Sequence, residues 1–329
     1  MELLKTYDAP DKSRVRIWRW IAPDTEDEMR LARYLTASLG FDSYRKYVND
    51  QAYWRLYYRE ALAGHNAPEV IDHLYLAEVD GVFVARVWFA YGIRSGRGNF
   101  GNVYTEQEFR RRGLMNELLK PCARDFQDSP ARMLCCASGD KFAVQSYLKY
   151  GFKLIYGGEV GPLCLCKNDF FAEAEAAFAD LSGLSVRPGR LADQFECDKF
   201  LKYIPAMLHN PRAHRIGPAA KISEYRIAFQ EVLSGNGVVN VVETPRGDVA
   251  GYAFALTDGS QCFMDFTVHC DALEGASDLL RRTADEFAAR FGTRPMLYVS
   301  AADSERAAAV RSAGFFALCA APDELVIYQ

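Results

Sequence analysis

The chain has 329 residues, of which 50% are hydrophobic and 25% are charged, the balance of an ordinary globular protein with room for two domains. Its formal net charge of -4 gives no general attraction to nucleic acid or to an anionic membrane. The charged N-terminus lacks the apolar segment of a signal peptide, and no apolar run approaches the roughly 20 residues that span a bilayer. We therefore expect a cytoplasmic protein that binds neither nucleic acid nor a membrane.

The 9 cysteines are an odd number, and most of them lie in apolar runs, including the Cys319 run and the stretches MLCCAS at 133–138 and PLCLCK at 162–167. Buried reduced thiols are favoured over disulfides in such a pattern. Cys164 and Cys166 would share one face of a strand, but no second pair of ligands accompanies them. The sequence therefore predicts no metal site.

Hydrophobic periodicity in the first half predicts a sheet flanked by helices. The clearest element is a hairpin, in which strands at 73–79 and 82–91 flank the turn pair Asp80-Gly81. The other predicted elements are a strand at 15–20, helices at 24–39 and 43–63, a strand at 99–105, a helix at 112–126, a strand at 132–138, a helix at 141–150, and strands at 152–156 and 162–167.

An Ala-rich connector at 171–184, helical from residue 172, separates this half from a second one. The same order of elements then returns, and Tyr150-Gly151-Phe152 has an echo in Ala313-Gly314-Phe315. The predicted elements are a strand at 185–187, helical stretches within 191–229, strands at 238–243, 249–256 and 262–269, a helix at 277–291, a strand at 295–300, a helix at 304–313 and two strands within 315–328.

The most informative segment is NFGNVYTEQEFRRRGLMNELLK at 99–120, which predicts a strand, an Arg-rich loop and a helix. The first N–H groups of a helix lack partners and carry the positive end of its dipole. Gly113 allows a ligand to approach the backbone, and arginines supply charge and forked donors. Solvated arginines on an ordinary turn are the alternative, but positive charges oppose the dipole unless an anion is bound. The segment therefore predicts a diphosphate site.

The same residues resemble a known family. The pattern Arg/Gln-x-x-Gly-x-Gly/Ala after a strand is typical of the GNAT acyltransferase superfamily, and residues 110–115 read Arg-Arg-Arg-Gly-Leu-Met, with Met115 in place of the last small residue. At the expected distance, Ala143-x-x-x-Tyr147-x-x-x-Gly151-Phe152 is similar to the second GNAT motif, and Asp140 stands where many members have Asn. The resemblance implies an α/β (α+β) fold of two tandem GNAT-like domains, each a mixed, mostly antiparallel sheet flanked by helices.

The resemblance also implies site residues for acetyl-CoA or another acyl-CoA as cosubstrate. The pantetheine arm would lie along the strand end, and Tyr147 would protonate the leaving thiolate as a general acid; packing of the helix on the sheet is the alternative role for this tyrosine. Arg110 and Arg112 would be charge partners of the diphosphate. The residues implied in cofactor binding are Val103, Tyr104 and Thr105 for the pantetheine, Arg110, Arg111, Arg112, Gly113, Leu114, Met115 and Asn116 for the diphosphate, and Phe142 and Ala143 for the channel.

The reaction implied is direct attack of a neutral amine on the thioester, but its base is open. Asn99 occupies a position where many family members have Glu, and Asn cannot act as a base. A water chain, a backbone carbonyl or another carboxylate must serve, or the acceptor arrives deprotonated. Three carboxylates lie in the region, and they are better explained as solvated groups: Glu78, Glu106 and Glu108. Cys135 and Cys136 are better explained as core thiols without a His partner.

The second half resembles a degenerate GNAT domain, because the loop after its predicted strand at 262–269 lacks a basic residue, although Gly275 and Ala276 are small. Diphosphate binding is disfavoured there. His209, Arg212 and His214 would form a basic loop near the cleft or, as favoured, a surface loop without a role. The predicted domains are a catalytic domain at 1–170, the connector at 171–184 and a degenerate domain at 185–329.

The leading hypothesis is an N-acetyltransferase for the amine of a small molecule, without a metal and active as a monomer or homodimer. The alternative is an acyl-CoA sensor or a partner-binding module that lacks catalysis; Met115 and Asn99 favour it, and Tyr147 opposes it. Aminoacyl transfer from tRNA on a related double fold is a third hypothesis, which the diphosphate loop and the acidic net charge oppose. The sequence leaves the acceptor and the acyl chain length open.

Overall fold

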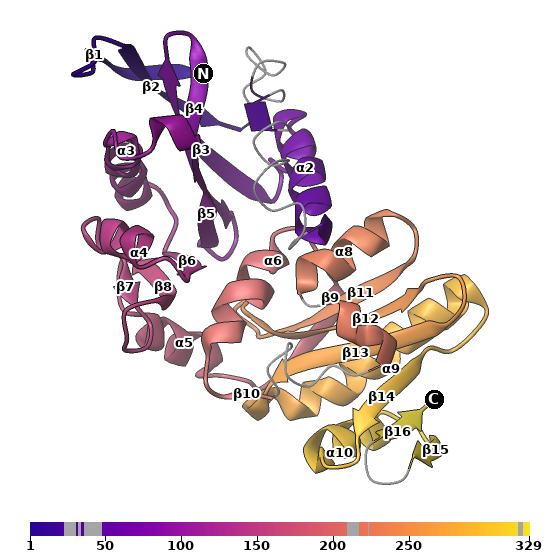
Figure 1. Ribbon diagram of the computed structural model, residues 1–329. Helices are drawn as coiled ribbons and strands as arrows, with labels where there is room; N and C mark the ends of the chain where they lie inside the picture. The colour runs from indigo at the N-terminus through magenta and orange to yellow at the C-terminus, as the bar shows by residue number, and fades with distance from the viewer. Residues whose placement is uncertain (23–30, 32–33, 36–47, 209–216, 223, 322–324) are drawn as a thin grey trace. The chain divides into compact units, whose positions relative to one another are not determined.

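The computed structural model describes the chain except for residues 23–30, 32–33, 36–47, 209–216, 223 and 322–324. The chain divides into two compact units, Met1–Phe170 and Phe171–Gln329 (Figure 1). No helix among the described residues is both long and apolar enough to cross a membrane. Each unit is built on its own mixed sheet.

The sheet of the first unit has eight strands in the order β1-β2-β3-β4-β5-β6-β8-β7. Neighbouring strands are antiparallel except β5 and β6, which run parallel. The strands are β1 (Glu2–Asp8), β2 (Arg14–Ile21), β3 (Val70–Val79), β4 (Val82–Gly92), β5 (Arg97–Thr105), β6 (Met133–Ser138), β7 (Lys153–Leu154) and β8 (Gly161–Cys166), and the helices are α2 (Val48–Leu62), the 3₁₀ helix η1 (Gln107–Phe109), α3 (Leu114–Asp128) and α4 (Lys141–Leu148).

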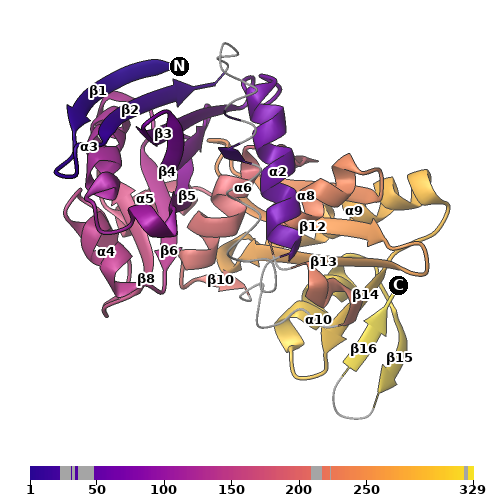
Figure 2. The ribbon, with the colours of Figure 1, turned by 45° about the horizontal axis from the view of Figure 1, so that its top comes forward.

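Helices cover both faces of this sheet, since side chains alternate between the faces along each strand. On one face α2 packs through Trp54 on Trp88 of β4, with ring centroids 5.1 Å apart. On the other face Leu118 of α3 and Val144 of α4 join a core that includes Phe89 of β4. Figures 1 and 2 show α2 on one side of the strands and α3 with α4 on the other.

The second unit repeats this order of strands. Its sheet runs β15-β16-β14-β13-β12-β11-β9, again with one parallel pair, β13 and β14, so the predicted repeat and fold class are confirmed. The strands are β9 (Ser185–Pro188), β10 (Met207–Leu208), β11 (Gly237–Glu243), β12 (Val249–Thr257), β13 (Cys262–His269), β14 (Met296–Ser300), β15 (Ala317–Ala321) and β16 (Leu325–Tyr328), and the longer helices are α5 (Phe170–Phe178), α8 (Tyr225–Leu233), α9 (Leu273–Phe291) and α10 (Ser304–Ser312).

The short helical pieces of this unit lie between β9 and α8, in the region predicted to contain helical stretches. They are α6 (Asp193–Phe195), the π-helical turn η2 (Glu196–Phe200), and the 3₁₀ helices η3 (Leu201–Tyr203) and η4 (Gly217–Lys221), with η5 (Cys270–Ala272) following β13. One face of the sheet carries α9 and α10, whose Leu280 and Val310 lie in a core with Phe266. The ring of Tyr225 from α8 meets Tyr252 on the other face, 5.3 Å away.

The similar motifs Tyr150-Gly151-Phe152 and Ala313-Gly314-Phe315 end a helix in the same way. Gly151 and Gly314 both have left-handed backbones, with φ of 91° and 87°. The N–H of the following Phe152 bonds to Tyr147 O, and that of Phe315 bonds to Val310 O, the six-to-one bond of a Schellman motif. Both phenylalanines are buried, so each helix is turned back onto its sheet in the same way.

Several predicted boundaries were wrong. Helix α3 begins at Leu114 rather than at 112 and α9 begins at Leu273 rather than at 277, while β3 begins at Val70 rather than at 73. Polar Asp72 hid the start of β3, because it interrupts the apolar pattern although it is buried. Strand β1 was not predicted, and most of the predicted helix at 24–39 and the start of that at 43–63 lie outside the described residues.

Replacement of either helix-ending glycine tests the shared ending. We expect Gly151→Ala and Gly314→Ala each to lower the free energy of unfolding by about 1–2 kcal/mol, because alanine resists a left-handed backbone. Gly157→Ala is the control, since its backbone is not left-handed and an added Cβ there meets nothing within 4 Å. Urea denaturation measures all three, and equal effects of the three replacements would contradict the assignment.

Candidate functional site

Strand β5 changes its pairing halfway along. Its start pairs in parallel with β6, and the last of these pairs joins Asn99 to Cys135. Among the described strands, β5 pairs only with β4 beyond Asn99, and the register between them shifts before Tyr104. Asn102 lies in this shift with a φ of 49°, which marks a β-bulge. The end of β5 therefore presents backbone groups on its β6 side without a neighbouring strand.

The residues predicted to bind pantetheine, Val103, Tyr104 and Thr105, lie on this end of β5 and are all half-buried. A strand edge of this kind can accept an extended amide chain as an added strand. Because β5 and β6 run parallel, the helices that follow them, α3 and α4, both start from the same edge of the sheet. The two predicted motifs therefore meet at that edge.

The loop between β5 and α3 ends at Gly113, which precedes the first helical residue and has a φ of 78°. A Cβ placed there would meet nothing within 4 Å, so the space in front of the helix is open. No side chain caps α3. The N–H groups of Asn116 and Glu117 bond to Gly113 O, whereas those of Leu114 and Met115 have no acceptor among the described residues. An uncapped helix start facing open space is suited to an anion.

The three arginines before Gly113 have different surroundings. Arg110 donates from Nε to Thr105 O at 2.9 Å and so ties the loop to β5. Arg112 pairs with Asp11 at 2.5 Å and stacks on Phe109, with 4.9 Å from Cζ to the ring centroid. Arg111 is exposed, has a φ of 65° and contacts no acid within the described part of the chain. Arg111 is thus the cation most available to a ligand.

Helix α4 begins with a side-chain cap. Asp140 accepts hydrogen bonds from the N–H groups of Phe142 and Ala143 at 2.8 and 3.3 Å, so the Asp found in place of Asn performs the capping. Ala143 is half-buried, whereas Phe142 is 85% exposed. An exposed aromatic beside a helix start is available to line a channel.

Tyr147 lies deeper on α4, with 6% of its surface exposed. Its ring contacts Phe100 of β5 and Phe152, with centroids 5.1 and 5.7 Å apart. Burial raises the pKa of the Tyr147 hydroxyl above its usual value, so the group is protonated at neutral pH and is a weaker acid than an exposed tyrosine. Packing and proton donation are both compatible with this position.

The carboxylates considered as bases have other roles in the structure. Glu78 was expected to be solvated, but it is buried and accepts hydrogen bonds from Arg16 and Trp18, both at 3.1 Å. Glu106 accepts from the Tyr104 hydroxyl at 2.9 Å, and Glu108 is exposed as expected. Glu78 can be buried because Arg16 and the indole of Trp18 donate hydrogen bonds to its carboxylate oxygens.

The cysteines are all free. Cys135, Cys136 and Cys164 are buried, as predicted, whereas Cys319 is exposed because it lies on β15, the last strand at one edge of its sheet. The donor atoms of the neighbouring His269, Cys270 and Asp271 lie within 4.8 Å of one another. Nδ1 of that histidine already accepts the backbone N–H of Asp271 at 3.3 Å.

Sequence reasoning missed Asp72, a fully buried carboxyl on β3. Its Oδ1 accepts hydrogen bonds from the Tyr57 hydroxyl at 2.8 Å and from Trp88 Nε1 at 2.7 Å. Its Oδ2 has no hydrogen-bond partner among the described residues. Burial raises the pKa of Asp72 to about 6, although the side chains of Trp88, Tyr57 and Asn66 act on the carboxyl in the opposite direction as hydrogen-bond donors. An acid inside the apolar run VIDHLYLAEV was the signal that could have found it.

The second unit lacks the open strand end of the first. Strand β13 pairs with β12 without a register shift and with β14 only at Phe263 and Met264. Where β13 leaves β14, the short strand β10 pairs with Val268 and His269. The position of an added strand is therefore already taken by the chain itself. His209, Arg212 and His214, the predicted basic loop, lie outside the described residues.

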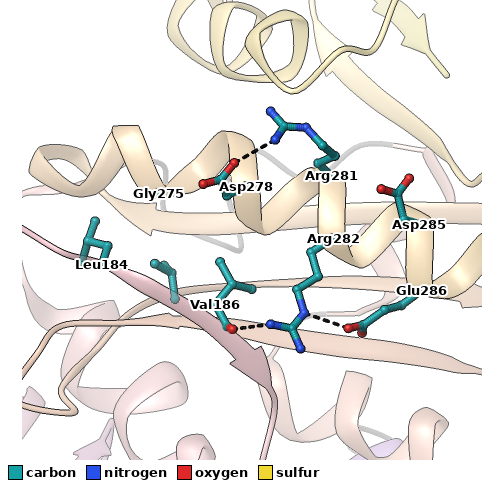
Figure 3. A pocket seen from close by; sticks show the side chains of 9 residues that line it. Leu184, Val186, Gly275, Asp278, Arg281, Arg282, Asp285 and Glu286 are labelled. Carbon is teal, nitrogen blue, oxygen red and sulfur yellow. Dashed lines mark hydrogen bonds and ion pairs between the residues drawn. The ribbon is translucent and has the colours of Figure 1, made fainter.

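A pocket of about 410 Å³ lies beside α9, next to β9 and β11 (Figure 3). Its charges pair among themselves, since Arg281 contacts Asp278 at 2.9 Å and Arg282 contacts Glu286 at 2.8 Å. Each arginine of this pocket therefore faces an acid of the same helix. The lining residues are Leu184, Val186, Val242, Gly275, Asp278, Arg281, Arg282, Asp285 and Glu286.

Comparison with known proteins gives a match within the first unit. Residues 34–152 match the family model described as Acetyltransferase (GNAT) family. No curated protein matches the sequence.

Similar solved structures include the PaiA N-acetyltransferase of Thermoplasma acidophilum in complex with coenzyme A, which is 14% identical, with 45% of this chain and 99% of that chain covered and a TM-score of 0.33. A GNAT family acetyltransferase of Brucella melitensis in complex with acetyl-CoA is 15% identical, with 46% and 89% covered and a TM-score of 0.33. A GCN5-related N-acetyltransferase of Kribbella flavida is 12% identical, with 83% and 62% covered and a TM-score of 0.34.

Asp72→Asn tests the state of the buried carboxyl. With a folded pKa of about 6, the folded chain keeps a proton that the unfolded chain releases near pH 4, so wild-type stability falls as pH rises through this window. The variant lacks this loss. We expect its stability relative to wild type to increase by up to about 3 kcal/mol between pH 4 and pH 7. Urea denaturation at both pH values measures it, and a difference that does not change with pH would contradict the raised pKa.

Proposed function

Because residues 34–152 carry a domain of the acetyltransferase (GNAT) family, we propose that the chain is an N-acetyltransferase that transfers the acyl group of acetyl-CoA, or of a related acyl-CoA, to the amine of a small molecule. One observation carries the proposal: the uncapped start of α3 opens behind Gly113, and the loop before it follows the end of β5 that pairs with β4 and, in the described part of the chain, not with β6. A diphosphate and an extended pantetheine arm need these two features side by side.

Each part of the cosubstrate has a matching group in this proposal. The free N–H groups of Leu114 and Met115 receive the diphosphate, with Arg111 as its main cation. The backbone from Val103 to Thr105 pairs with the amides of the pantetheine arm. Phe142 and Ala143 line the channel at the start of α4. The residues present therefore fit an acyl-CoA.

In the reaction, a neutral amine attacks the carbonyl carbon of the thioester, so that a C–N bond forms and the C–S bond breaks. The departing thiolate takes the proton of the Tyr147 hydroxyl. Support for the role comes from the place of Tyr147 in the second motif and not from its pKa, because the raised pKa makes the hydroxyl a weaker acid than an exposed tyrosine. The proton lost by the nitrogen then restores the tyrosine through solvent or a nearby carrier, and the products are an amide and free CoA.

We further propose that only the part at 1–170 is catalytic, that 171–184 connects it to the rest, and that 185–329 is a degenerate domain. The pairing of β10 with the end of β13 and the paired charges around the second-unit pocket support this assignment. The proposal also includes a cytoplasmic location, activity as a monomer or homodimer, and no metal.

A second candidate function is an acyl-CoA sensor or partner-binding module without catalysis. It is favoured by Asn99, an amide that cannot accept a proton from the amine, and by the bulky Met115 within the diphosphate loop. The two functions share the cosubstrate site and differ in turnover. Release of CoA thiol from acetyl-CoA in the presence of small amines separates them.

Replacement of Arg111 tests the cosubstrate site. We expect Arg111→Ala to weaken acetyl-CoA binding by about 10-fold or more, because a charge-assisted hydrogen bond to the diphosphate is lost. Titration calorimetry measures the affinity and the stoichiometry, which should be one acetyl-CoA per chain. Arg281→Ala, in the pocket beside α9, is the control and should bind as wild type does. Absence of binding by the wild-type chain would refute the proposed function.

Replacement of Tyr147 tests the acid. We expect Tyr147→Phe to lower kcat by about 100-fold, the lower range for the loss of general acid–base catalysis, with unchanged affinity for acetyl-CoA. The matched control is Tyr156→Phe, a partly exposed tyrosine outside the motif. Stopped assays of CoA release measure both. A lower affinity with unchanged kcat would instead assign Tyr147 to packing alone.

A further inference from the structure

Three residues form a row across the middle of the first sheet. Asp72 of β3 lies opposite Ala90 of β4, and Ala90 lies opposite Asn99 of β5. Residues that face each other in antiparallel strands point to the same side of the sheet. Since adjacent strands are about 4.8 Å apart, the Cα atoms of Asp72 and Asn99 are separated by about 10 Å. In this row the methyl group of Ala90 stands between them.

Both ends of this row present a buried oxygen that accepts no hydrogen bond. Asp72 is 0% exposed and Asn99 is 5% exposed, and neither Asp72 Oδ2 nor Asn99 Oδ1 has a partner in the described part of the chain. An unsatisfied buried acceptor destabilises the fold, and more so when it is charged. Two such acceptors on either side of one alanine indicate a missing donor.

The row lies at the point where the proposed chemistry takes place. Asn99 is the last residue of β5 that pairs with β6, so it borders the opening in which the pantetheine arm ends. On the same face, Gly101 lies opposite Trp88, and a Cβ at Gly101 would meet nothing within 4 Å. The face beside Asn99 is therefore open at its next strand position.

The surroundings add aromatic rings to the acid, and the same face of β4 also carries the buried Arg86, opposite Leu76. The ring of Trp88 meets Trp54 and Tyr57 of α2 at 5.1 and 5.8 Å between centroids, and aromatic faces attract ammonium groups. The other buried acid of β3 that points to this face, Glu78, already binds Arg16 and Trp18. Within the described part of this face of β3, Asp72 supplies the negative charge that is left for a ligand.

We infer that Asp72 and Asn99 form the acceptor subsite and that the acceptor is a small primary amine that arrives as an ammonium ion; the inference rests on the proposed function. The ammonium donates one hydrogen bond to Asp72 Oδ2 and one to Asn99 Oδ1, above Ala90. Asp72 takes one proton and leaves a neutral amine. Attack by this amine forms the C–N bond and the C–S bond breaks, while the departing thiolate takes the proton of the Tyr147 hydroxyl. The second proton lost by the nitrogen restores the tyrosine through solvent, and Asp72 later releases its own proton to solvent.

Exchange of the two side chains tests the subsite, with n-butylamine as the probe acceptor and acetyl-CoA as the donor. We expect Asp72→Asn to lower amine-dependent CoA release by about 100-fold or more, as the loss of a general base does, while the affinity for acetyl-CoA stays unchanged. The double variant Asp72→Asn with Asn99→Asp returns a carboxylate to the same row. Its rate of CoA release should be at least about 10-fold higher than that of Asp72→Asn. A purely structural role of Asp72 would not produce this recovery.

Glu78→Gln is the matched control, since it removes another buried carboxylate from the same strand and face, and it should keep the wild-type rate. Asn99→Ala retains the Asp72 carboxylate and should raise KM for n-butylamine about 10-fold. This variant tests the subsite if Asp72→Asn fails to fold. Three outcomes would overturn this inference alone. They are equal rates for wild type and Asp72→Asn, equal losses of rate for Asp72→Asn and Glu78→Gln, and a wild-type chain that binds acetyl-CoA but does not acetylate n-butylamine. A wild-type chain that binds no acetyl-CoA would overturn the proposed function as well.

Discussion

The site depends on the loss of backbone pairing in the middle of a central strand. Beyond Asn99, β5 keeps β4 but gives up β6, and the bulge at Asn102 bends it further. Interior strands normally satisfy both edges, since unpaired buried amides are costly. Here the free edge is tolerable if a ligand completes it, and the same divergence opens the space into which α3 directs its uncapped N–H groups.

The second unit shows what happens when the same topology fills that gap. It repeats the strand order and the helix ending at Gly314, but β10 pairs with the free end of β13. The chain thus satisfies internally the groups that the first unit leaves open. A scaffold and a site can therefore be separated: the fold is retained by its core, whereas ligand binding needs the unsatisfied edge.

Two residues in the first unit occupy positions that are unfavourable for the stability of the fold. Asp72 is buried with a raised pKa, and Arg111 adopts a left-handed backbone beside other cations at a helix start. Such conflicts are expected where a ligand supplies the missing partner. The proposed acyl-CoA resolves the second conflict through its diphosphate, and the proposed ammonium resolves the first.

The sequence by itself determined the repeated order of elements, the Arg-rich loop before α3 and the tyrosine of α4, because periodicity, glycines and short motifs are local signals. It placed Glu78 in solvent and passed over Asp72, since burial of an acid depends on donors such as Trp18, Tyr57 and Trp88 from other strands and helices. Only the tertiary structure decided that Asp72 and Asn99 share one row, because strand register joins residues that are distant in the chain. It also decided which unit keeps an open strand edge, since β10 reaches β13 through a long-range pairing that no local pattern encodes.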